Sequence, residues 1–150
     1  NVIGIRQHPE KFLPLIVRKV MSQERLYIHS SPDLKVSGSR FYIDVKDVCD
    51  AVHFLMKYCV DNNVPTDKFN IVGSKEISNL DLAKMIALEM KENLIYSMVD
   101  FHSSRPGHDL RYSLCGERMK NLGWEPKPIE IRIKDFVSWY LNEENSHWLF

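Results

Sequence analysis

The segment "RFYIDVKDVCDAVHFLMKYCV" (residues 40–60) decides the fold class, because a strand pattern runs directly into a helix pattern. Residues 40–45 are rich in aromatic and β-branched side chains, which favours a short β-strand. From residue 45 to residue 60, apolar side chains recur at helical spacing and form one face made of Val48, Val52, Leu55, Met56 and Cys59. The segment therefore predicts a strand followed by a helix in an α/β protein.

The alternation of helices and strands continues on both sides of this segment. Further helices are predicted over residues 9–22, 78–93, 116–124 and 129–144, and further strands over residues 25–30, 68–73 and 94–101. Pro14 is expected near the first turn of its helix. The last helix is expected to turn five side chains inward, namely Ile133, Phe136, Val137, Tyr140 and Leu141. Strands this short, spread between helices, predict an α/β fold with a small mixed sheet and flanking helices.

The composition sets limits on partners and compartment. The 150 residues are enough for one domain with a hydrophobic core. Twenty basic side chains balance twenty acidic ones, so no overall charge attracts nucleic acid or an anionic membrane. No apolar run approaches the roughly 20 residues that span a bilayer. Three widely spaced cysteines favour free, buried thiols in a reducing compartment over a disulfide framework or a zinc site.

Several familiar active-site motifs are absent from the sequence. It contains no glycine-rich turn for a dinucleotide, no phosphate-binding P-loop and no G-x-S-x-G nucleophile motif. Tyr42 and Lys46 have the spacing of a Y-x-x-x-K pair. However, Tyr42 lies in a predicted strand and Lys46 at a helix start, so they would not share a helix face. Neither a cofactor site nor a catalytic pair is therefore predicted in these residues.

The polar stretch "SSRPGHDLRY" (residues 103–112) is the first candidate for ligand binding. Arg105 carries a planar fork of donors that suits an oxyanion, and Pro106 holds it in extended geometry. Gly107 allows the backbone to approach a ligand closely, and His108 adds a ring donor. The composition fits an anion clamp, but an exposed turn with a surface arginine is the simpler interpretation of these residues alone.

Three further polar residues lie at the ends of predicted elements. Arg40, at the start of a strand, is placed either to meet a ligand or to pair with Asp44 or Asp47. Ser78 and Asn79 are both candidate caps of the next helix, and Asn79 also marks a helix start whose free amides could bind an anion. His29 ends a strand, and a packed histidine is the simpler interpretation.

Several motifs together resemble one known family. They are "NVIGIRQHPEKFLPLIV" (residues 1–17), "SRFYIDVKDVCDAV" (39–52), "FNIVGSKEISNLDLAK" (69–84) and "SRPGHDLRYSL" (104–114). In this order they resemble motifs of the dTDP-glucose 4,6-dehydratases, which are extended short-chain dehydrogenase/reductases. The resemblance covers nearly the whole chain. It implies the C-terminal, nucleotide-sugar-binding portion of such an enzyme, without the N-terminal Rossmann half and its catalytic residues. Because the sequence begins inside a motif, we expect a fragment that is inactive alone.

The resemblance also implies a reaction and its setting. The family enzyme is an NAD-dependent lyase of deoxysugar biosynthesis that oxidises C4 of the hexose, eliminates water across C5–C6 and forms dTDP-4-keto-6-deoxyglucose. It implies NAD bound by the other half, a nucleotide-sugar substrate, a homodimer and a cytoplasmic location, with no metal, membrane or nucleic acid. Two alternatives stay open. One is an extended family member acting on UDP-sugars as a dehydratase, epimerase or decarboxylase, and the other is a non-catalytic nucleotide-sugar-binding module.

The motif matches imply roles for individual residues. Arg40 and Arg105 match diphosphate ligands, His108 a ribose or diphosphate ligand, Asn1 a residue near the sugar diphosphate, and Asn79 one near the nucleotide. Lys11, Phe12, Leu13, Pro14, Leu15 and Ile16 match the segment lining the nucleotide, and Tyr27, Ile28 and His29 match the strand contacting the base. His29 stands where many members have tyrosine, and Ser104 replaces an acid. Thymine and uracil therefore both stay open as the base.

Overall fold

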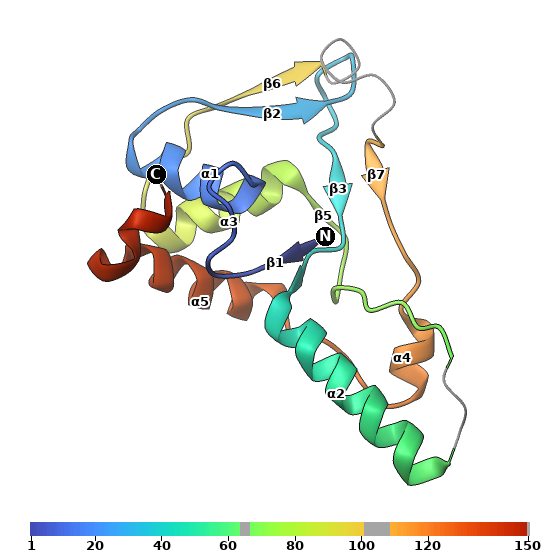
Figure 1. Cartoon of the computed structure of the whole chain (residues 1–150). Coiled ribbons are helices and arrows are strands. Elements are labelled where there is room, and N and C mark those ends of the chain that lie inside the picture. The colour runs from blue at the N-terminus through green and yellow to red at the C-terminus, as the bar shows by residue number, and fades with distance from the viewer. Residues whose placement is uncertain (64–66, 101–108, 150) are drawn as a thin grey trace.

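The computed structural model of the chain describes residues 1–63, 67–100 and 109–149 (Figure 1). Its helices are α1 (Phe12–Met21), α2 (Val45–Asn62), α3 (Asn79–Met90), α4 (Glu117–Asn121), α5 (Ile129–Leu141) and the 3-10 helix η1 (Glu143–Leu149). Its strands are β1 (Val2–Ile3), β2 (Leu26–Ser30), β3 (Ser39–Arg40), β4 (Ile43–Asp44), β5 (Ile77–Ser78), β6 (Tyr96–Asp100) and β7 (Arg111–Tyr112). The predicted helices are confirmed to within a few residues at their ends.

The strands confirm a small mixed α/β architecture, but they form three sheets in the described residues. β1 pairs with β4 and β2 with β6, both in parallel, while β3 lies between antiparallel β5 and parallel β7. The predicted strand over residues 40–45 is therefore two strands in two sheets. The buried Tyr42 lies at the crossing between them.

The strand predicted over residues 68–73 is wrong. These residues are described, and they form neither a strand nor a helix. A segment becomes a strand only where a neighbouring backbone supplies ladder partners. Gly73 packs against Tyr42 so closely that an added Cβ would lie 2.0 Å from the Tyr42 carbonyl oxygen, yet no ladder forms there. β5, which the sequence did not predict, pairs with β3 instead.

A layered core supports one end of the molecule. The β2–β6 ribbon lies over α1 and α3, and α5 packs beneath them (Figure 1). The buried side chains include Leu13 and Ile16 of α1, Ile28 of β2 and Phe136 of α5. Ile133, Val137 and Tyr140 are buried as predicted, whereas Leu141, the last residue of α5, is 45% exposed. Side chains of β2 and α1 belong to the same core cluster, and both elements contribute to the site described below.

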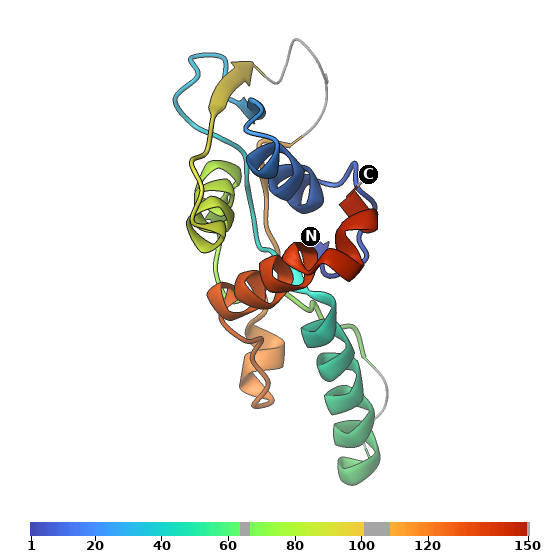
Figure 2. The same cartoon turned by 90° about the vertical axis from the view of Figure 1, so that its left-hand side faces the viewer.

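Helix α2 extends away from this core in both views (Figures 1 and 2). Only Asp47 and Ala51 are buried in it, while Val52 is 46% and Met56 65% exposed. None of the five side chains of the predicted apolar face is therefore fully buried: Val52 and Met56 are exposed, and the other three are half-buried. The sequence pattern shows which side chains share a face and cannot show what covers it.

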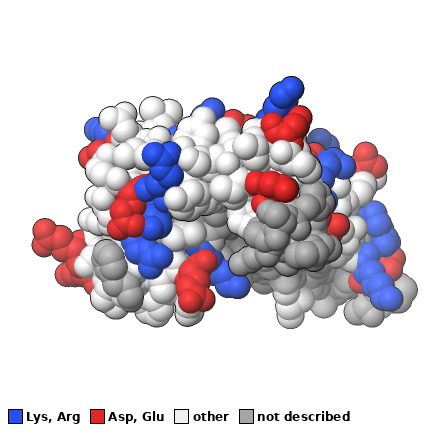
Figure 3. All heavy atoms as spheres, turned by 90° about the horizontal axis from the view of Figure 1, so that it is seen from above, with Lys and Arg blue, Asp and Glu red and all other residues white. Residues whose placement is uncertain are grey.

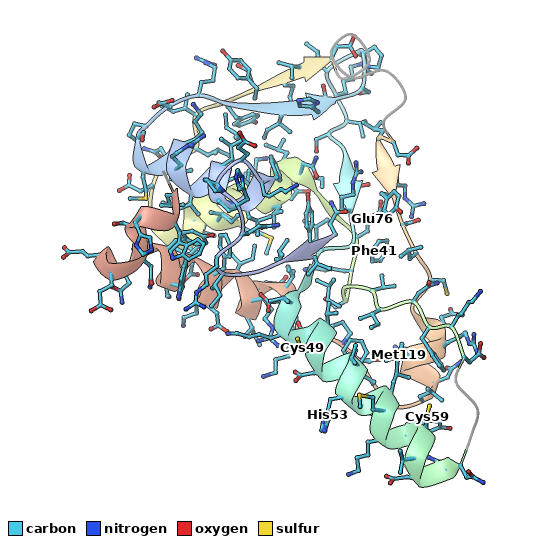
Figure 4. The ribbon with its side chains drawn as sticks, viewed as in Figure 1. Phe41, Cys49, His53, Cys59, Glu76 and Met119 are labelled. Atoms are coloured by element: carbon cyan, nitrogen blue, oxygen red, sulfur yellow. The ribbon has the colours of Figure 1, made fainter. Side chains whose placement is uncertain are left out.

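The three cysteines are free, as predicted, but they are not buried. Cys49 and Cys115 are exposed and Cys59 is partly exposed. Figure 4 shows Cys49 and Cys59 along α2, with His53 between them pointing away from the rest of the molecule. The expectation of buried thiols is wrong: α2 projects from the core and leaves Cys49 exposed and Cys59 partly exposed, and Cys115 lies exposed before α4.

A buried ion pair ties α2 to α5. Arg132 donates from Nε to Asp47 Oδ2 at 2.9 Å and from Nη2 to Asp47 Oδ1, and both side chains are no more than 6% exposed. The hydrogen bond to Asp47 raises the pKa of Arg132. Asp44 accepts from the Lys46 amide and caps α2 at its start. The first turns of α2 are therefore anchored, although the rest of the helix projects.

We expect Asp47→Asn to destabilise the protein by about 3–5 kcal/mol, because it leaves the Arg132 guanidinium buried without a counter-charge. Urea unfolding followed by circular dichroism measures this loss. Glu125→Gln, which breaks the exposed Lys120–Glu125 pair, is the control and should cost less than about 1 kcal/mol. Equal losses in the two variants would show that burial of the Asp47–Arg132 pair is unimportant.

Candidate functional site

A cavity of about 710 Å³ opens where α1, β2, β3 and the start of α3 meet. Its wall combines segments that are far apart in the sequence. It is lined by Asn1, Glu10, Lys11, Phe12, Leu15, Tyr27, His29, Gly38, Arg40, Tyr42, Asn79, Asp109 and Leu110. Its volume falls in the range of about 300–1,000 Å³ that is typical of small-molecule sites.

Eight residues expected at the site line this cavity together, namely Asn1, Lys11, Phe12, Leu15, Tyr27, His29, Arg40 and Asn79. Four others lie elsewhere: Leu13, Pro14, Ile16 and Ile28 have buried side chains. The helical period of α1 and the alternation of β2 turn these four side chains toward the core. Arg105 and His108 lie outside the described residues.

Arg40 is held by backbone oxygens rather than by carboxylates. Its Nη1 donates to the carbonyls of Ser39 (2.7 Å) and Leu110 (2.9 Å), and its Nη2 donates to the carbonyl of Asp109 (2.8 Å). The alternative that Arg40 pairs with Asp44 or Asp47 is wrong, because Asp44 caps α2 and Asp47 binds Arg132. Carbonyl partners leave the positive charge of Arg40 uncompensated by an ion pair among the described residues. The cation therefore remains available to attract an anion.

Asn79 is not the cap of α3. Ser78 is the cap, and its hydroxyl accepts from the Asp81 amide at 3.0 Å. The expected free amides are also not found, since the Asn79 amide donates to the Gly38 carbonyl (2.7 Å) and the Leu80 amide to the Ser37 hydroxyl (3.3 Å). The start of α3 therefore contributes the Asn79 side chain, and not free backbone amides, to the cavity.

Five cavity residues were missed in the sequence: Glu10, Gly38, Tyr42, Asp109 and Leu110. Tyr42 is buried, and its hydroxyl donates to Asn79 Oδ1 at 2.8 Å. Desolvation by burial raises the pKa of Tyr42 to about 12. Tyr42 therefore does not form a catalytic pair with Lys46, whose Nζ lies 4.0 Å from Asp135 on α5. The one sequence signal that could have placed Tyr42 in the cavity is its position two residues after Arg40.

The cavity combines positive charge with aromatic surface. Lys11 and Arg40 supply cationic groups, and Phe12 and Tyr27 supply rings, with Tyr27 largely exposed to solvent. Cations bind oxyanions and rings stack on planar groups, so the lining suits a ligand that carries both. Over the described part of the face seen from above, basic side chains lie beside acidic ones (Figure 3). Glu10 and Asp109 also line the cavity, so its two basic side chains are local groups and not part of a broad basic surface.

An ion pair fastens the sheet that carries Arg40. Glu76, labelled in Figure 4, accepts from Ser39 Oγ at 2.5 Å and from Arg111 Nε and Nη2 at 2.7 Å each. Glu76 thus joins β3 to β7 just before β5 begins. The hydrogen bonds from Arg111 and then from Ser39 lower the pKa of Glu76 from its ordinary 4.5 to about 2.

Neither a metal-binding cluster nor a membrane-spanning helix is found in the described residues. They contain no cluster of three or more His, Cys, Asp or Glu side chains arranged to hold a metal ion. Among the helices described, none has the length and apolar character required to cross a bilayer.

Comparisons with known proteins place the chain beside one group of enzymes. No family model matches it. It is 31% identical to the human dTDP-D-glucose 4,6-dehydratase over 98% of the chain and 41% of that protein. The dTDP-glucose 4,6-dehydratase of Bacillus anthracis in complex with NAD has 27% identity and a TM-score of 0.74, over 99% of the chain and 44% of that structure. The UDP-glucose 4-epimerase of Thermotoga maritima with UDP-glucose, at 24% identity and a TM-score of 0.68 over 93% and 43% of the chains, shares the fold alone.

The fold is that of the C-terminal part of an extended short-chain dehydrogenase/reductase. Within this class, the resemblance to the dTDP-glucose 4,6-dehydratase family is confirmed over nearly the whole chain. The chain spans about 40% of the length of the curated relatives that it matches.

We expect the Glu76–Arg111 contact to stabilise the fold above pH 4.5 and to be lost progressively as the pH falls toward 2. The sign follows from the lowered folded-state pKa, because the unfolded chain takes up the proton first as the pH falls. Unfolding curves between pH 2 and 7 should show wild type and Glu76→Gln converging at the acidic end. Arg111→Ala should behave like Glu76→Gln, and a gap between wild type and Glu76→Gln that is constant over this range would contradict the assignment.

Proposed function

We propose that this chain is the nucleotide-sugar-binding, C-terminal portion of an NAD-dependent dTDP-glucose 4,6-dehydratase that forms dTDP-4-keto-6-deoxyglucose. The observation that carries the proposal is the shared cavity. Eight residues chosen by their motifs, from five separate segments of the chain, line one hollow of suitable volume. Similar motifs without a similar fold would not bring these side chains together.

The described side chains suit the parts of a nucleoside diphosphate. Arg40, and Lys11 at the start of α1, supply positive charge for the phosphates. Tyr27 and His29 on β2 supply a surface for the base, and the Asn79 carboxamide lies on the wall beside Arg40. Charge-assisted hydrogen bonds of this kind contribute about 1.5–3 kcal/mol each when well aligned. From the motif alone, we add Arg105 and His108 to the diphosphate and ribose contacts.

In this proposal, the chain binds and orients the substrate and leaves the chemistry to another part of the enzyme. NAD would supply hydride transfer at C4 and C6 of the hexose, and the printed sequence has no glycine-rich turn to hold it. The residues here would fix the nucleotide so that the hexose stands at the reaction centre, which is how remote binding energy assists catalysis. We also propose that the complete enzyme is a homodimer located in the cytoplasm, as the family resemblance implies.

The outward face of α2 supports the view that the chain is one portion of a larger protein. Exposed Val45, Val52, Met56 and Val60 follow one another along the helix, beside the exposed Val2 of β1. A run of apolar side chains on a projecting helix is costly in water and usually marks a contact surface. We propose that the remaining part of the enzyme packs here.

The first alternative keeps the cavity and changes the nucleotide. The UDP-glucose 4-epimerase of Thermotoga maritima shares the fold, and His29 in place of tyrosine alters the surface for the base. A UDP-sugar dehydratase, epimerase or decarboxylase would use the same phosphate contacts. A non-catalytic nucleotide-sugar-binding module is the second alternative, and it would bind ligand fully without help from other domains.

Calorimetric titration of the protein with dTDP and with UDP tests the proposed ligand. We expect saturable binding, tighter for dTDP, and an affinity about 10- to 100-fold lower in Arg40→Lys, which keeps the charge and loses the planar fork. Arg118→Ala is the control, because Arg118 lies over the Phe69 ring and does not line the cavity. Tighter binding of UDP would favour the first alternative. Binding of neither ligand, or Arg40→Lys behaving like Arg118→Ala, would contradict the proposal.

A second experiment tests whether this chain binds the substrate without carrying out the chemistry. Incubated with NAD and dTDP-glucose, the 150-residue chain should form no 4-keto-6-deoxy product above a protein-free blank, as monitored by mass spectrometry. The reason is that the proposal leaves NAD binding and the acid–base chemistry to the other part of the enzyme. Product formation by the chain alone would show that its own residues suffice for the chemistry.

A further inference from the structure

The hydroxyl of Tyr42 faces the interior, and its one hydrogen bond among the described residues is to Asn79. Tyr42 lies between β3 and β4, is 4% exposed and donates to Asn79 Oδ1 at 2.8 Å. Because burial keeps the phenol protonated up to a pKa of about 12, the hydroxyl remains a donor at every physiological pH. The two residues are 37 positions apart in the sequence and meet only through the fold.

This contact determines which way the Asn79 carboxamide faces. A carboxamide carries an acceptor oxygen and a donor nitrogen in one plane, on opposite sides of the Cβ–Cγ bond. With Oδ1 bound to Tyr42, Nδ2 is turned toward Gly38, where an added Cβ would lie 3.2 Å from it. Gly38, Tyr42 and Asn79 all line the cavity. No described residue accepts a hydrogen bond from Nδ2.

The backbone around the carboxamide is held as firmly as the side chain. The Asn79 amide donates to the Gly38 carbonyl at 2.7 Å, and Ser39, the next residue, pairs with Ser78 in the β3–β5 ladder. Gly38 leaves room for Nδ2 on the wall, since an added methyl group there would also press on the Leu110 carbonyl at 3.1 Å. Both the base and the tip of the Asn79 side chain are therefore fixed before any ligand arrives.

We infer that Tyr42 is a positioning residue that holds the Asn79 carboxamide with its Nδ2 donor facing the cavity, so that Asn79 recognises an acceptor oxygen of the ligand, such as a phosphate oxygen. This inference rests on the proposed function, which supplies the diphosphate. It specifies the polarity of the contact, and it gives a buried tyrosine a role in binding rather than in chemistry. Without the Tyr42 hydroxyl, the carboxamide could turn its oxygen toward the phosphate and repel it.

Tyr42→Phe removes the hydroxyl and keeps the ring. We expect roughly a five- to twentyfold loss of dTDP affinity, because one preorganised hydrogen bond is lost. Asn79→Ala should cause a similar loss, and adding Tyr42→Phe to Asn79→Ala should change the affinity less than twofold. This lack of additivity is the signature of one residue acting through the other.

Tyr140→Phe is the matched control. Tyr140 is equally buried, and its hydroxyl donates to the Gln7 carbonyl at 3.2 Å, yet it does not line the cavity. It should lower the melting temperature and leave dTDP affinity unchanged. A loss of affinity in Tyr140→Phe as large as that in Tyr42→Phe would show a general effect of stability and overturn the inference.

Asn79→Asp gives a second test that leaves the tyrosine intact. One carboxylate oxygen can accept from Tyr42 while the other faces the phosphate, so affinity should fall further than in Asn79→Ala. Wild-type affinity in Tyr42→Phe or in Asn79→Asp would refute the positioning role while leaving the proposed ligand in place. If wild type binds neither dTDP nor UDP, the proposed function fails and this inference fails with it.

Discussion

The cavity depends on the hydrogen bonds that the Arg40 guanidinium donates to the carbonyl oxygens of Asp109 and Leu110. They join two segments separated by about 70 residues, and they use a charged donor against neutral acceptors. The hydrogen bonds satisfy the guanidinium without cancelling its charge. One side chain therefore both closes the wall of the cavity and makes it attractive to an anion.

The contacts next to Arg40 reinforce the same wall. Ser39 is tied through Glu76 to Arg111, the Gly38 carbonyl receives the Asn79 amide, and Tyr42 holds the Asn79 side chain. Successive residues of one crossing segment thus bind the start of α3 and the strand β7. This segment passes from one small sheet to another, and its backbone geometry is set by both sheets. Rigidity of this kind lets a site hold donors in place before binding, which lowers the entropic cost of binding.

Much of this could be predicted from the sequence, and the failures have a common cause. Helical spacing located the helices, and motif order brought Arg40, Asn79, Tyr27 and Lys11 to one site. The strand over residues 68–73 was wrong, because its composition suits a strand but its pairing depends on distant backbone. Similarly, the role of Tyr42 was missed, and carboxylates were predicted as the partners of Arg40 in place of carbonyl oxygens. Most of the true partners of both residues come from segments far away in the chain. The exposure of the apolar face of α2 was missed for the same reason, because helical periodicity shows which residues share a face but not what covers that face.

The most direct test of the account is a map of amide chemical-shift changes on the 15N-labelled protein titrated with dTDP. The account predicts that the largest changes fall on Leu15, Tyr27, His29, Arg40 and Asn79, which line the large cavity. A second hollow of about 230 Å³, lined by residues that include Phe41, Met119 and Trp124, provides the comparison. Changes centred on that hollow, or no changes at saturating dTDP, would contradict the assignment of the nucleotide site.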